Sequence, residues 1–469
     1  MMTAQTNEMI ENKTFDEIQI GDSARLVKTL THSDIQAFAA VSGDTNPTHL
    51  DARYADTTEF HEIVGHSMWS GSLISSLLGN TLPGPGTVYL DQQLHFLQPV
   101  KLGDTLTVVV RATAKDSAKR AVTFQCSVSN QRQEPVLTGE AIVLAPSQKV
   151  RLEKIHAPHI KVFDPEARLK NLLAQGAHLP AIRCGVVHPC EPGAIQGALD
   201  AAARDLIIPV LIGPKARIES IAKANGLDIS GLEIVDTPHS HASADMAASM
   251  AAEGKVEALM KGSLHTDELM GAVLHTPTLR TKRRVSHIFR FEVPLYDKPL
   301  LITDAAINIK PTLTDKADII QNAIQLAHIL GNPNPKVAIL SAVETVNPNI
   351  ASTLDAAALC KMADRRQITG AELDGPLAFD NAISREAAKI KKIESSVAGQ
   401  ADILLAPDLE SANMIAKQLE YFGGATGSGI VLGARIPIAL TSRADGPDTR
   451  MASALLAKLV AHHYRSHKP

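Results

Sequence analysis

Residues 63–79 read IVGHSMWSGSLISSLLG, a stretch in which Gly and Ser separate the apolar side chains at close intervals. Because small side chains let neighbouring elements approach closely, this composition predicts a helix buried tightly beneath a sheet. The first backbone N–H groups of such a helix, around His66–Met68, would face whatever group lies at that end. A helix N-terminus stabilises negative charge that develops on an oxygen atom, so this end is a candidate site for chemistry.

The segments that follow the predicted helix supply the sheet. Strand-like runs are separated by turns such as Pro83–Gly86 and Leu102–Asp104, and consecutive strands joined by short polar turns favour an antiparallel sheet. We therefore expect an α+β domain over residues 1–146, with strands at Thr87–Phe96, Thr105–Thr113, Ala121–Ser129 and Pro135–Leu144.

From about Ala181 the pattern changes to strands that alternate with Ala-rich helices. Continuous apolar strands that alternate with helices are typical of an α/β sheet covered on both faces. We expect strands at Arg183–Val187, Ile207–Ile212, Val256–Met260, Leu300–Thr303, Val337–Leu340, Ile403–Leu405 and Gly429–Leu440. We expect helices at Ala194–Asp205, Ala242–Glu253, Lys316–Leu330, Ser384–Ala398 and Ser411–Tyr421.

The segment between the two patterns lacks periodicity. Residues 147–165 are charged and contain His and Pro, so we interpret them as a linker between a domain at 1–146 and a second at 166–469. A length of 469 residues gives a prior of about three folding units, which fits a second domain made of two subdomains.

Composition excludes several classes of protein. A formal net charge of −4 and 3% aromatic residues argue against a nucleic-acid partner, which needs a basic surplus or a stacking surface. The four Cys form no CxxC motif, and we expect neither a disulfide framework nor a metal site. The polar, acidic start and the absence of any apolar run near 18 residues predict a cytoplasmic protein without a membrane partner.

The sharpest N-terminal motif is VSGDTNPTHLD, residues 41–51. The residue before a proline avoids the helical region, so Asn46-Pro47 predicts a turn that can bring Asp44 and His49 together. A carboxylate beside an imidazole is a usable acid/base pair, in which one group activates water and the other handles a second proton. Taken alone, the motif also fits an Asx-turn with a surface histidine.

With YADTTEF, GHSMWSGSLISSLLG and LPGPGTVYLDQQLHFLQPVKLGDTL following in order, the segment Phe15–Leu144 resembles the MaoC-like (R)-specific enoyl-CoA hydratases. The resemblance implies a hot-dog fold, in which a sheet wraps a long central helix and two units pair. It also implies that Asp44 and His49 add water across a 2-enoyl-CoA and that Ser75 supports the pair. At the helix start the family usually has His-Gly-Met, where glycine permits close approach to the thioester oxygen; this chain has Ser67 there, a candidate substrate contact.

The C-terminal half lacks both G-x-x-x-x-G-K-[ST] and G-x-G-x-x-G, so neither a nucleotide triphosphatase nor a simple dinucleotide site is supported. The Gly-rich stretch 423–429 still lets backbone N–H groups face an anion, although it also fits a flexible turn. Three polar clusters stand out, KGSLHT at 261–266, RTKRRVSH at 280–287 and LTSRADGPD at 440–448. Cations and hydroxyls at strand ends suit phosphate-bearing ligands, although the basic run 280–284 also fits a solvated face.

Seven motifs in order make residues Val162–Tyr464 resemble the phosphate acetyl/butyryltransferase family. They are VVHPCEPGAIQGAL, LMKGSLHTDELM, RRVSHIFRFEVP, LLITDAAINIKP, ELDGPLAFDNAIS, LLAPDLESANMIAKQL and PIALTSRAD. The resemblance implies a two-subdomain α/β fold similar to isocitrate and isopropylmalate dehydrogenases, with the active site in the cleft. It implies the reaction acyl-CoA + phosphate ⇌ acyl phosphate + CoA, with no dinucleotide and no catalytic metal.

The same resemblance assigns roles by position. Ser442 and Arg443 match the family's active-site Ser-Arg, and Asp448 or Asp445 would be the base, with Asp448 preferred. The Asp of the acetyl branch, seven positions after the Ser, is Thr449 here, and the SRAD form is nearer the butyryl-like branch. Arg284 would be a second cation on the phosphate. The other candidate substrate-binding residues are Lys261, His265, Ser286, Gly427 and Gly429.

We therefore predict a bifunctional enzyme that acts on coenzyme A thioesters, a phosphotransacylase fused to a 2-enoyl-CoA hydratase, and we expect a homo-oligomer. Coenzyme A thioesters and phosphate would be substrates, and no bound cofactor is expected. The alternative is a phosphotransacylase whose hot-dog domain is a non-catalytic module for acyl-CoA binding or oligomerisation. A decarboxylating dehydrogenase on the related fold is disfavoured, because its clustered metal-binding aspartates do not occur in the right form.

Overall fold

The computed structural model of the chain describes residues 9–155, 163, 165–440 and 445–469. It separates into two compact units, Met1–Val162 and Phe163–Pro469. Within the predicted linker 147–165, residues Arg151–Glu153 form a strand (β7) that pairs antiparallel with β1 (Met9–Glu11). This part of the linker is therefore structured within the first unit, and the domain boundaries themselves stay a prediction.

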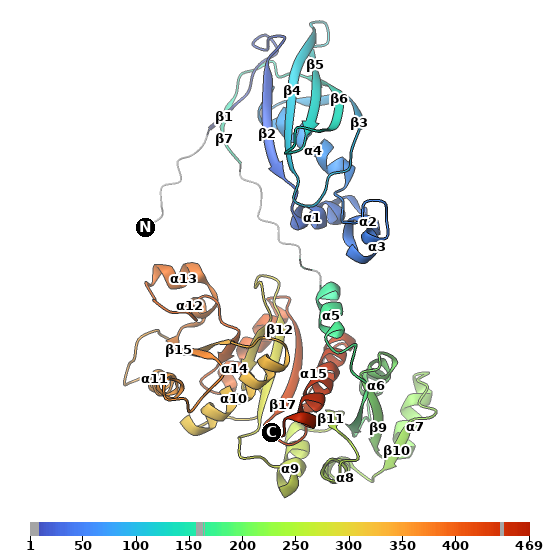
Figure 1. Cartoon of the computed structure of the whole chain (residues 1–469), viewed down its shortest axis with the longest axis vertical. Helices are drawn as coiled ribbons and strands as arrows, with labels where there is room; N and C mark the ends of the chain where they lie inside the picture. The colour runs from blue at the N-terminus through green and yellow to red at the C-terminus, as the bar shows by residue number, and fades with distance from the viewer. Residues whose placement is uncertain (1–8, 156–162, 164, 441–444) are drawn as a thin grey trace. The chain divides into compact units, whose positions relative to one another are not determined.

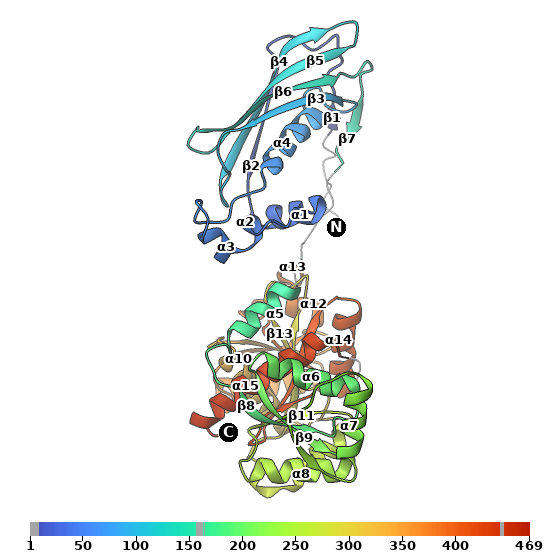
Figure 2. The ribbon, with the colours of Figure 1, turned by 90° about the vertical axis from the view of Figure 1, so that its right-hand side faces the viewer.

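The main sheet of the first unit, which is separate from the β1–β7 pair, curves over one long helix, as Figures 1 and 2 show. The sheet is antiparallel throughout, with the strand order β2-β4-β5-β6-β3. Its strands are β2 (Ser23–Thr29), β3 (Val88–Phe96), β4 (Thr105–Asp116), β5 (Ala121–Ser129) and β6 (Pro135–Leu144). Three helices precede the central one, α1 (His32–Ser42), α2 (Pro47–Leu50) and α3 (Ala52–Asp56). The predicted hot-dog architecture is confirmed.

The central helix α4 (Ser67–Asn80) is shorter at its start than the stretch 63–79 predicts. Val64 instead forms a bridge with Lys101, and the Gly65 N–H donates to Val100 O at 2.7 Å, which keeps this segment extended. His66 is consequently the residue before the helix, not a member of it. The rest of α4 packs in the core, where its buried residues Trp69, Leu73, Ile74, Leu77 and Leu78 meet the inner face of the sheet.

The second unit is built on a mixed sheet of eleven strands in the order β10-β9-β8-β11-β18-β17-β12-β13-β16-β14-β15. Pairing is parallel from β10 to β18 and again from β13 to β15, whereas the three central pairs, β18–β17, β17–β12 and β12–β13, are antiparallel. An odd number of reversals means that the two parallel halves run in opposite directions. The strands are β8 (Ile182–Val187), β9 (Ile207–Gly213), β10 (Glu233–Asp236), β11 (Ala258–Lys261), β12 (Ser286–Glu292), β13 (Leu300–Thr303), β14 (Lys336–Leu340), β15 (Glu372–Leu377), β16 (Ile403–Leu405), β17 (Thr426–Leu432) and β18 (Ile438–Ala439).

Helices cover both faces of this sheet, as the alternating pattern predicts (Figure 1). Helix α15 contributes to two separate cores: Leu455 packs with the β8–β9 half, and Leu456 packs with the β14–β16 half. The helices are α5 (Pro165–Ala174), α6 (Pro192–Ala203), α7 (Lys215–Ala224), α8 (Ser240–Ala252), α9 (Thr266–His275), α10 (Leu313–Ile329), α11 (Ala351–Asp364), α12 (Phe379–Ile383), α13 (Arg385–Ile390), α14 (Leu409–Tyr421) and α15 (Pro447–Ser466). No helix among the described residues combines the length and the apolarity that a membrane crossing requires.

Besides the central helix, two predicted elements of the second unit are wrong in extent. The predicted helix Ser384–Ala398 ends at Ile390, because Lys392 adopts a left-handed φ of 55° and the Ile393 N–H turns back to Ala388 O at 3.0 Å. The predicted strand Gly429–Leu440 is a pair of antiparallel strands, β17 and β18. The chain reverses between them at Gly433, whose φ of 95° is a conformation that favours glycine.

We predict that Gly139→Ala destabilises the first unit by about 1–3 kcal/mol, the usual range for overpacking. A Cβ at this position in β6 would lie 2.1 Å from Gln93 O on β3, so the backbone itself must move. The chain has one tryptophan, and it is the buried Trp69, so its fluorescence during urea unfolding reports on this unit. Gly79→Ala in α4 is the matched control, because its Cβ meets nothing within 4 Å. Equal midpoints for the two variants would refute the packing argument.

Candidate functional site

Asp44, His49 and His66 converge in the first unit. Asp44 lies in the turn after α1, where Gly43 takes a left-handed φ of 75°, and His49 lies in α2, whose N-terminus is capped by the Asn46 side chain. His66 directly precedes α4. One ligand atom from each side chain lies within 4.8 Å of the others. The tertiary structure therefore brings together the two residues that the motif predicts and adds a third.

Hydrogen bonds fix the tautomers of the two imidazoles. His49 Nδ1 lies 2.7 Å from Val64 O, and His66 Nε2 lies 2.9 Å from Asp44 O. Because a carbonyl oxygen only accepts, each of these ring nitrogens carries the proton. In the neutral form of each ring, His49 Nε2 and His66 Nδ1 are then the acceptor atoms, and His66 Nδ1 is buried with no hydrogen-bond partner among the described residues.

The arrangement is compatible with proton transfer and with metal binding. Among the described residues these three side chains form a group that could hold a metal ion, and the two imidazole rings are 4.0 Å apart between centroids and tilted by 37°. An exposed carboxylate beside an imidazole can also act as an acid/base pair.

The predicted helix residues lie at two places on α4. Ser67 is exposed in the first turn, beside the group formed by Asp44, His49 and His66. Ser75 lies eight residues further along the helix, about 12 Å at 1.5 Å per residue, and its side chain contacts Tyr89. Burial raises the pKa of Tyr89 to about 12, and the hydrogen bond with Ser75 opposes that rise.

In the second unit, Lys261 and His265 line a cavity of about 340 Å³, called here the Lys261 cavity. Its full lining is Lys261, Leu264, His265, Thr266, Phe289, Ala305, Ala306, Asn413, Lys417 and Leu440. The Lys261 side chain is buried at the end of β11, and Asn413 Nδ2 donates to Ala305 O at 3.1 Å. Sequence reasoning missed Phe289, Asn413 and Lys417, although each lies within one of the motifs that carry the family resemblance.

Two of the predicted catalytic residues, Ser442 and Arg443, lie outside the described residues. Leu440, the last described residue before them, lines the Lys261 cavity. Asp448 lies in the first turn of α15 and, with Gly427, lines a separate cavity of about 30 Å³. That small cavity contains a largely buried ion-pair chain, in which Glu292 binds Arg168 at 2.7 Å and Arg290 at 2.6 Å.

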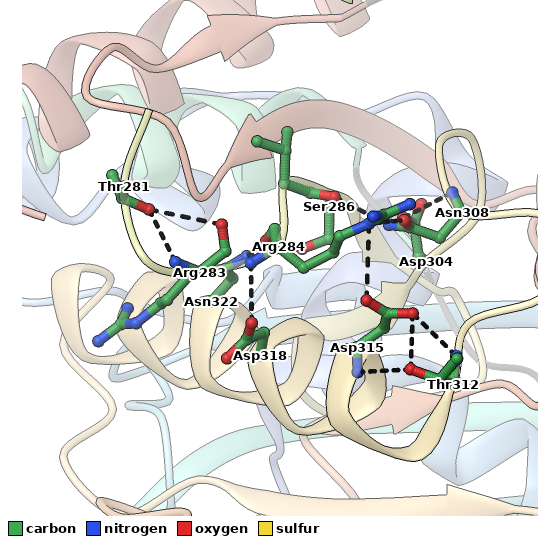
Figure 3. A network of polar contacts seen from close by, with 11 residues as sticks. Thr281, Arg283, Arg284, Ser286, Asp304, Asn308, Thr312, Asp315, Asp318 and Asn322 are labelled. Carbon is green, nitrogen blue, oxygen red and sulfur yellow. Dashed lines mark hydrogen bonds and ion pairs between the residues drawn. The ribbon is translucent and has the colours of Figure 1, made fainter. Parts of the chain in front are cut away.

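Arg284 and Ser286 belong to a polar network at the start of β12, drawn in Figure 3. Arg284 Nε donates to Asn308 Oδ1 at 2.7 Å, and the buried Ser286 Oγ accepts from Asn322 Nδ2 at 2.9 Å. Arg284 lines a third cavity, of about 300 Å³. Of the predicted substrate-binding residues in the second unit, Lys261 and His265 line one cavity, Arg284 lines another and Gly427 lines the small one. Ser286 and Gly429 line none of the three.

His287 follows Ser286 of the polar network in β12 and is fully buried. Its ring packs edge-on against Phe289, which lines the Lys261 cavity. Burial lowers its pKa to about 3, and neither ring nitrogen has a hydrogen-bond partner among the described residues. A Cβ on Gly429 would lie 2.8 Å from His287 Nε2 and 2.4 Å from Leu440 O. Gly429 is therefore needed for close packing against these two groups.

Comparison with known proteins gives matches for both units. A family model described as "MaoC like domain" matches residues 17–133, and one described as "Phosphate acetyl/butaryl transferase" matches residues 240–458. A phosphate acetyltransferase of Rickettsia felis is 51% identical over 323 residues, which cover 67% of this chain and 93% of that protein.

Solved structures also match each unit. The branched-chain phosphotransacylase of Enterococcus faecalis is 30% identical, with a TM-score of 0.53, and the match covers 60% of this chain and 99% of that one. The R-hydratase PhaJ1 of Pseudomonas aeruginosa is 43% identical, with a TM-score of 0.32, over 33% of this chain and 100% of that one.

The buried His287 makes the stability of the second unit depend on pH. The unfolded chain takes up a proton at this position near its ordinary pKa of 6.5, whereas the folded protein does so only near pH 3. The free energy of unfolding is therefore not reduced by His287 above about pH 6.5. As the pH is lowered from 6.5 towards 3, protonation of this group in the unfolded chain lowers that free energy by up to about 1.4 kcal/mol per pH unit.

We expect His287→Gln to make this fall shallower between pH 6.5 and 5. Far-UV circular dichroism during urea unfolding reports on both units and is dominated by the second, which holds most of the described helices. Trp69 fluorescence reports on the first unit alone and separates its transition from that of the second. Parallel pH profiles for the wild type and the variant would contradict the prediction.

Proposed function

Since this chain belongs to the phosphate acetyl/butyryl transferase family and carries a MaoC-like domain at its N-terminal end, we propose that it is a bifunctional enzyme of coenzyme A thioesters. The second unit transfers an acyl group, acetyl or butyryl, between coenzyme A and phosphate. The first unit adds water to a 2-enoyl-CoA. The observation that carries the first activity is the 51% identity over 93% of a phosphate acetyltransferase.

Acyl transfer proceeds in one ternary complex. A base removes the thiol proton of coenzyme A, the thiolate attacks the carbonyl carbon of the acyl phosphate, and the C–O bond to phosphate breaks as the tetrahedral intermediate collapses. Ser442 and backbone N–H groups stabilise the oxyanion, and Arg443 holds the departing phosphate through two hydrogen bonds. Asp448 is the proposed base. Because Asp448 lines the separate small cavity, Asp445 is kept as the alternative, and paired Asn variants would distinguish the two.

The Lys261 cavity is the proposed location of this chemistry. Leu440, two residues before Ser442 in the chain, lines it together with Lys261 and His265. Lys261 supplies the second cation near the phosphate, because Arg284 lines a different cavity and is held by Asn308. We further propose that the two halves of this unit are two subdomains arranged as in isocitrate and isopropylmalate dehydrogenases.

Hydration is assigned to Asp44 and His49. One of the two removes a proton from water, whose oxygen bonds to the β-carbon, and the other returns a proton to the α-carbon. The first N–H groups of α4 stabilise the enolate oxygen that forms in between. The convergence of Asp44 and His49 beside this helix start supports the assignment. In the alternative function, this unit binds acyl-CoA without catalysis.

Reciprocal variants test the two activities on the whole chain. We predict that Arg443→Ala and Arg443→Lys lower acyl transfer about 100-fold to 1,000-fold, because lysine lacks the planar fork that holds phosphate bidentately. Hydration of crotonyl-CoA, followed by its loss of absorbance, should not change. Asp44→Asn should lower hydration about 100-fold or more and leave transfer intact.

Each outcome separates the hypotheses. If Arg443→Ala melts several degrees lower while its transfer rate stays near normal, Arg443 has only a structural role. If the wild-type chain does not hydrate enoyl-CoA of any length from C4 to C8, the first unit is the non-catalytic module.

We also propose that the chain forms a homo-oligomer through β3. This edge strand exposes Val88, Leu90 and Phe96, and an unpaired apolar edge is a ready surface for a second copy. Light scattering should give at least twice the 50.0 kDa mass of the chain. Leu90→Lys should lower that mass, whereas Val27→Lys on the opposite edge strand β2 should not. A single species of 50.0 kDa at micromolar concentration would rule the oligomer out.

A further inference from the structure

We propose that the third cavity binds the phosphate groups at the nucleotide end of coenzyme A, an inference that rests on the proposed acyl transfer. This arginine cavity has a volume of about 300 Å³. It is lined by Leu274, Arg280, Thr281, Arg283, Arg284, Val285, Ile307, Asn308 and Gly433. Three of these residues are arginines and none is a carboxylate.

Among the described residues, Arg280 and Arg283 form no ion pair. Arg280 Nε donates to Leu274 O, and Arg283 Nη1 donates to Gln325 Oε1 at 2.9 Å, so both guanidinium groups are held by neutral acceptors. Of the three arginines, Arg284 is the one that forms an ion pair with another described residue, and its Nε lies 3.8 Å from Asp315 Oδ1. Uncompensated positive charge in a concave site attracts an anion with several charges.

The arginine segment is fixed before any ligand arrives (Figure 3). Thr281 Oγ1 donates to Gly433 O at 2.6 Å and accepts the Arg283 N–H at 3.0 Å. The Arg284 N–H donates to Asp318 Oδ2 at 2.9 Å, and Asn322 Nδ2 donates to Arg284 O at 2.9 Å. A site whose donors are already positioned loses little conformational entropy when it binds.

One short loop separates the arginine cavity from the Lys261 cavity. Ala305 and Ala306 line the Lys261 cavity, and the next two residues, Ile307 and Asn308, line the arginine cavity. The buried Asp304 carboxylate holds this loop by accepting the N–H groups of Ala306, Ile307 and Asn308 at 3.0–3.1 Å. A long ligand can therefore have its reactive end in one cavity and its charged end in the other.

The lining favours the nucleotide end of coenzyme A over free phosphate. Inorganic phosphate must meet the acyl carbon, so its place is beside the thioester in the Lys261 cavity. The arginine cavity also offers the apolar side chains of Leu274, Val285 and Ile307. Apolar surface next to guanidinium groups suits a nucleotide, whose base is largely apolar and whose phosphates accept bidentate hydrogen bonds from arginine.

Steady-state kinetics on the whole chain test this site. Arg280→Ala and Arg283→Ala should each raise the KM for acyl-CoA in acyl transfer about 10-fold to 100-fold, the effect of losing one charged hydrogen bond. The KM for phosphate should stay unchanged. The wild type should prefer acyl-CoA to acyl-dephospho-CoA, which lacks the 3′-phosphate, and the variants should lose that preference.

Two controls accompany the variants. Lys282→Ala removes a charge from the same segment but not from the cavity lining, and it should leave every KM unchanged. The KM for crotonyl-CoA in hydration is measured on the same protein and should not move, because that site lies in the other unit.

The outcomes distinguish this proposal from the proposed function. If the wild type does not transfer acyl groups, the function fails; the site is then tested by calorimetry with coenzyme A and dephospho-CoA, and equal affinities for the wild type and Arg283→Ala overturn it. In an active enzyme, a raised KM for phosphate with an unchanged KM for acyl-CoA would place inorganic phosphate in this cavity and overturn the proposal. An unchanged KM for acyl-CoA in both variants, or an equal effect from Lys282→Ala, would also overturn it.

Discussion

The burial of helix α15 on two sides is the constraint on which the second unit depends. Met451, Leu455 and Leu459 pack into the core of the β8–β9 half, and Leu456, Val460 and Tyr464 pack into the core of the β14–β16 half. Each fully buried Leu or Val contributes about 1.5–3 kcal/mol, so sliding the helix would disrupt both cores at once. Ser453 on this helix also accepts the Gly429 N–H at 3.0 Å, which ties the helix to β17.

The consequence for function lies at the N-terminal end of α15. The chain runs from β18 through Leu440 at the Lys261 cavity into the segment that carries Ser442 and Arg443, and then into α15. Both described elements that flank this segment in the sequence, β18 and α15, are packed in the core. Helix α4 plays a similar role in the first unit. Its apolar side chains are buried under the sheet, and it begins directly after His66, which lies close to Asp44 and His49. In each unit, then, a buried helix begins close to the residues assigned to the chemistry.

Two of the three cavities in the second unit are linked by one loop. The reacting groups and the charged end of a coenzyme A thioester are far apart in the ligand, and in the second unit the Lys261 and arginine cavities lie on either side of the loop 304–308. Asp304 supports both, because one buried carboxylate holds three consecutive N–H groups of that loop. The ion-pair chain of Arg168, Glu292 and Arg290 instead joins α5 to β12, and it has the burial and pairing of a structural element.

The sequence by itself determined the elements that depend on local patterns. The spacing of small and apolar residues located most of α4, and the runs between turns located the four strands Val88–Leu144. Asp44 and His49 do lie close together, although Asn46-Pro47 begins the short helix α2 instead of forming the predicted turn. The tertiary structure alone decided strand direction and the grouping of distant motifs. Apolar periodicity records that a strand is buried, not which way its neighbour runs, so the reversal at Gly433 and the three antiparallel pairs were not visible in it. For the same reason the sequence could not show that Lys261 and Arg284 line different cavities, or that Gly427 and His265 do. Whether two polar residues share a cavity depends on contacts between segments far apart in the chain.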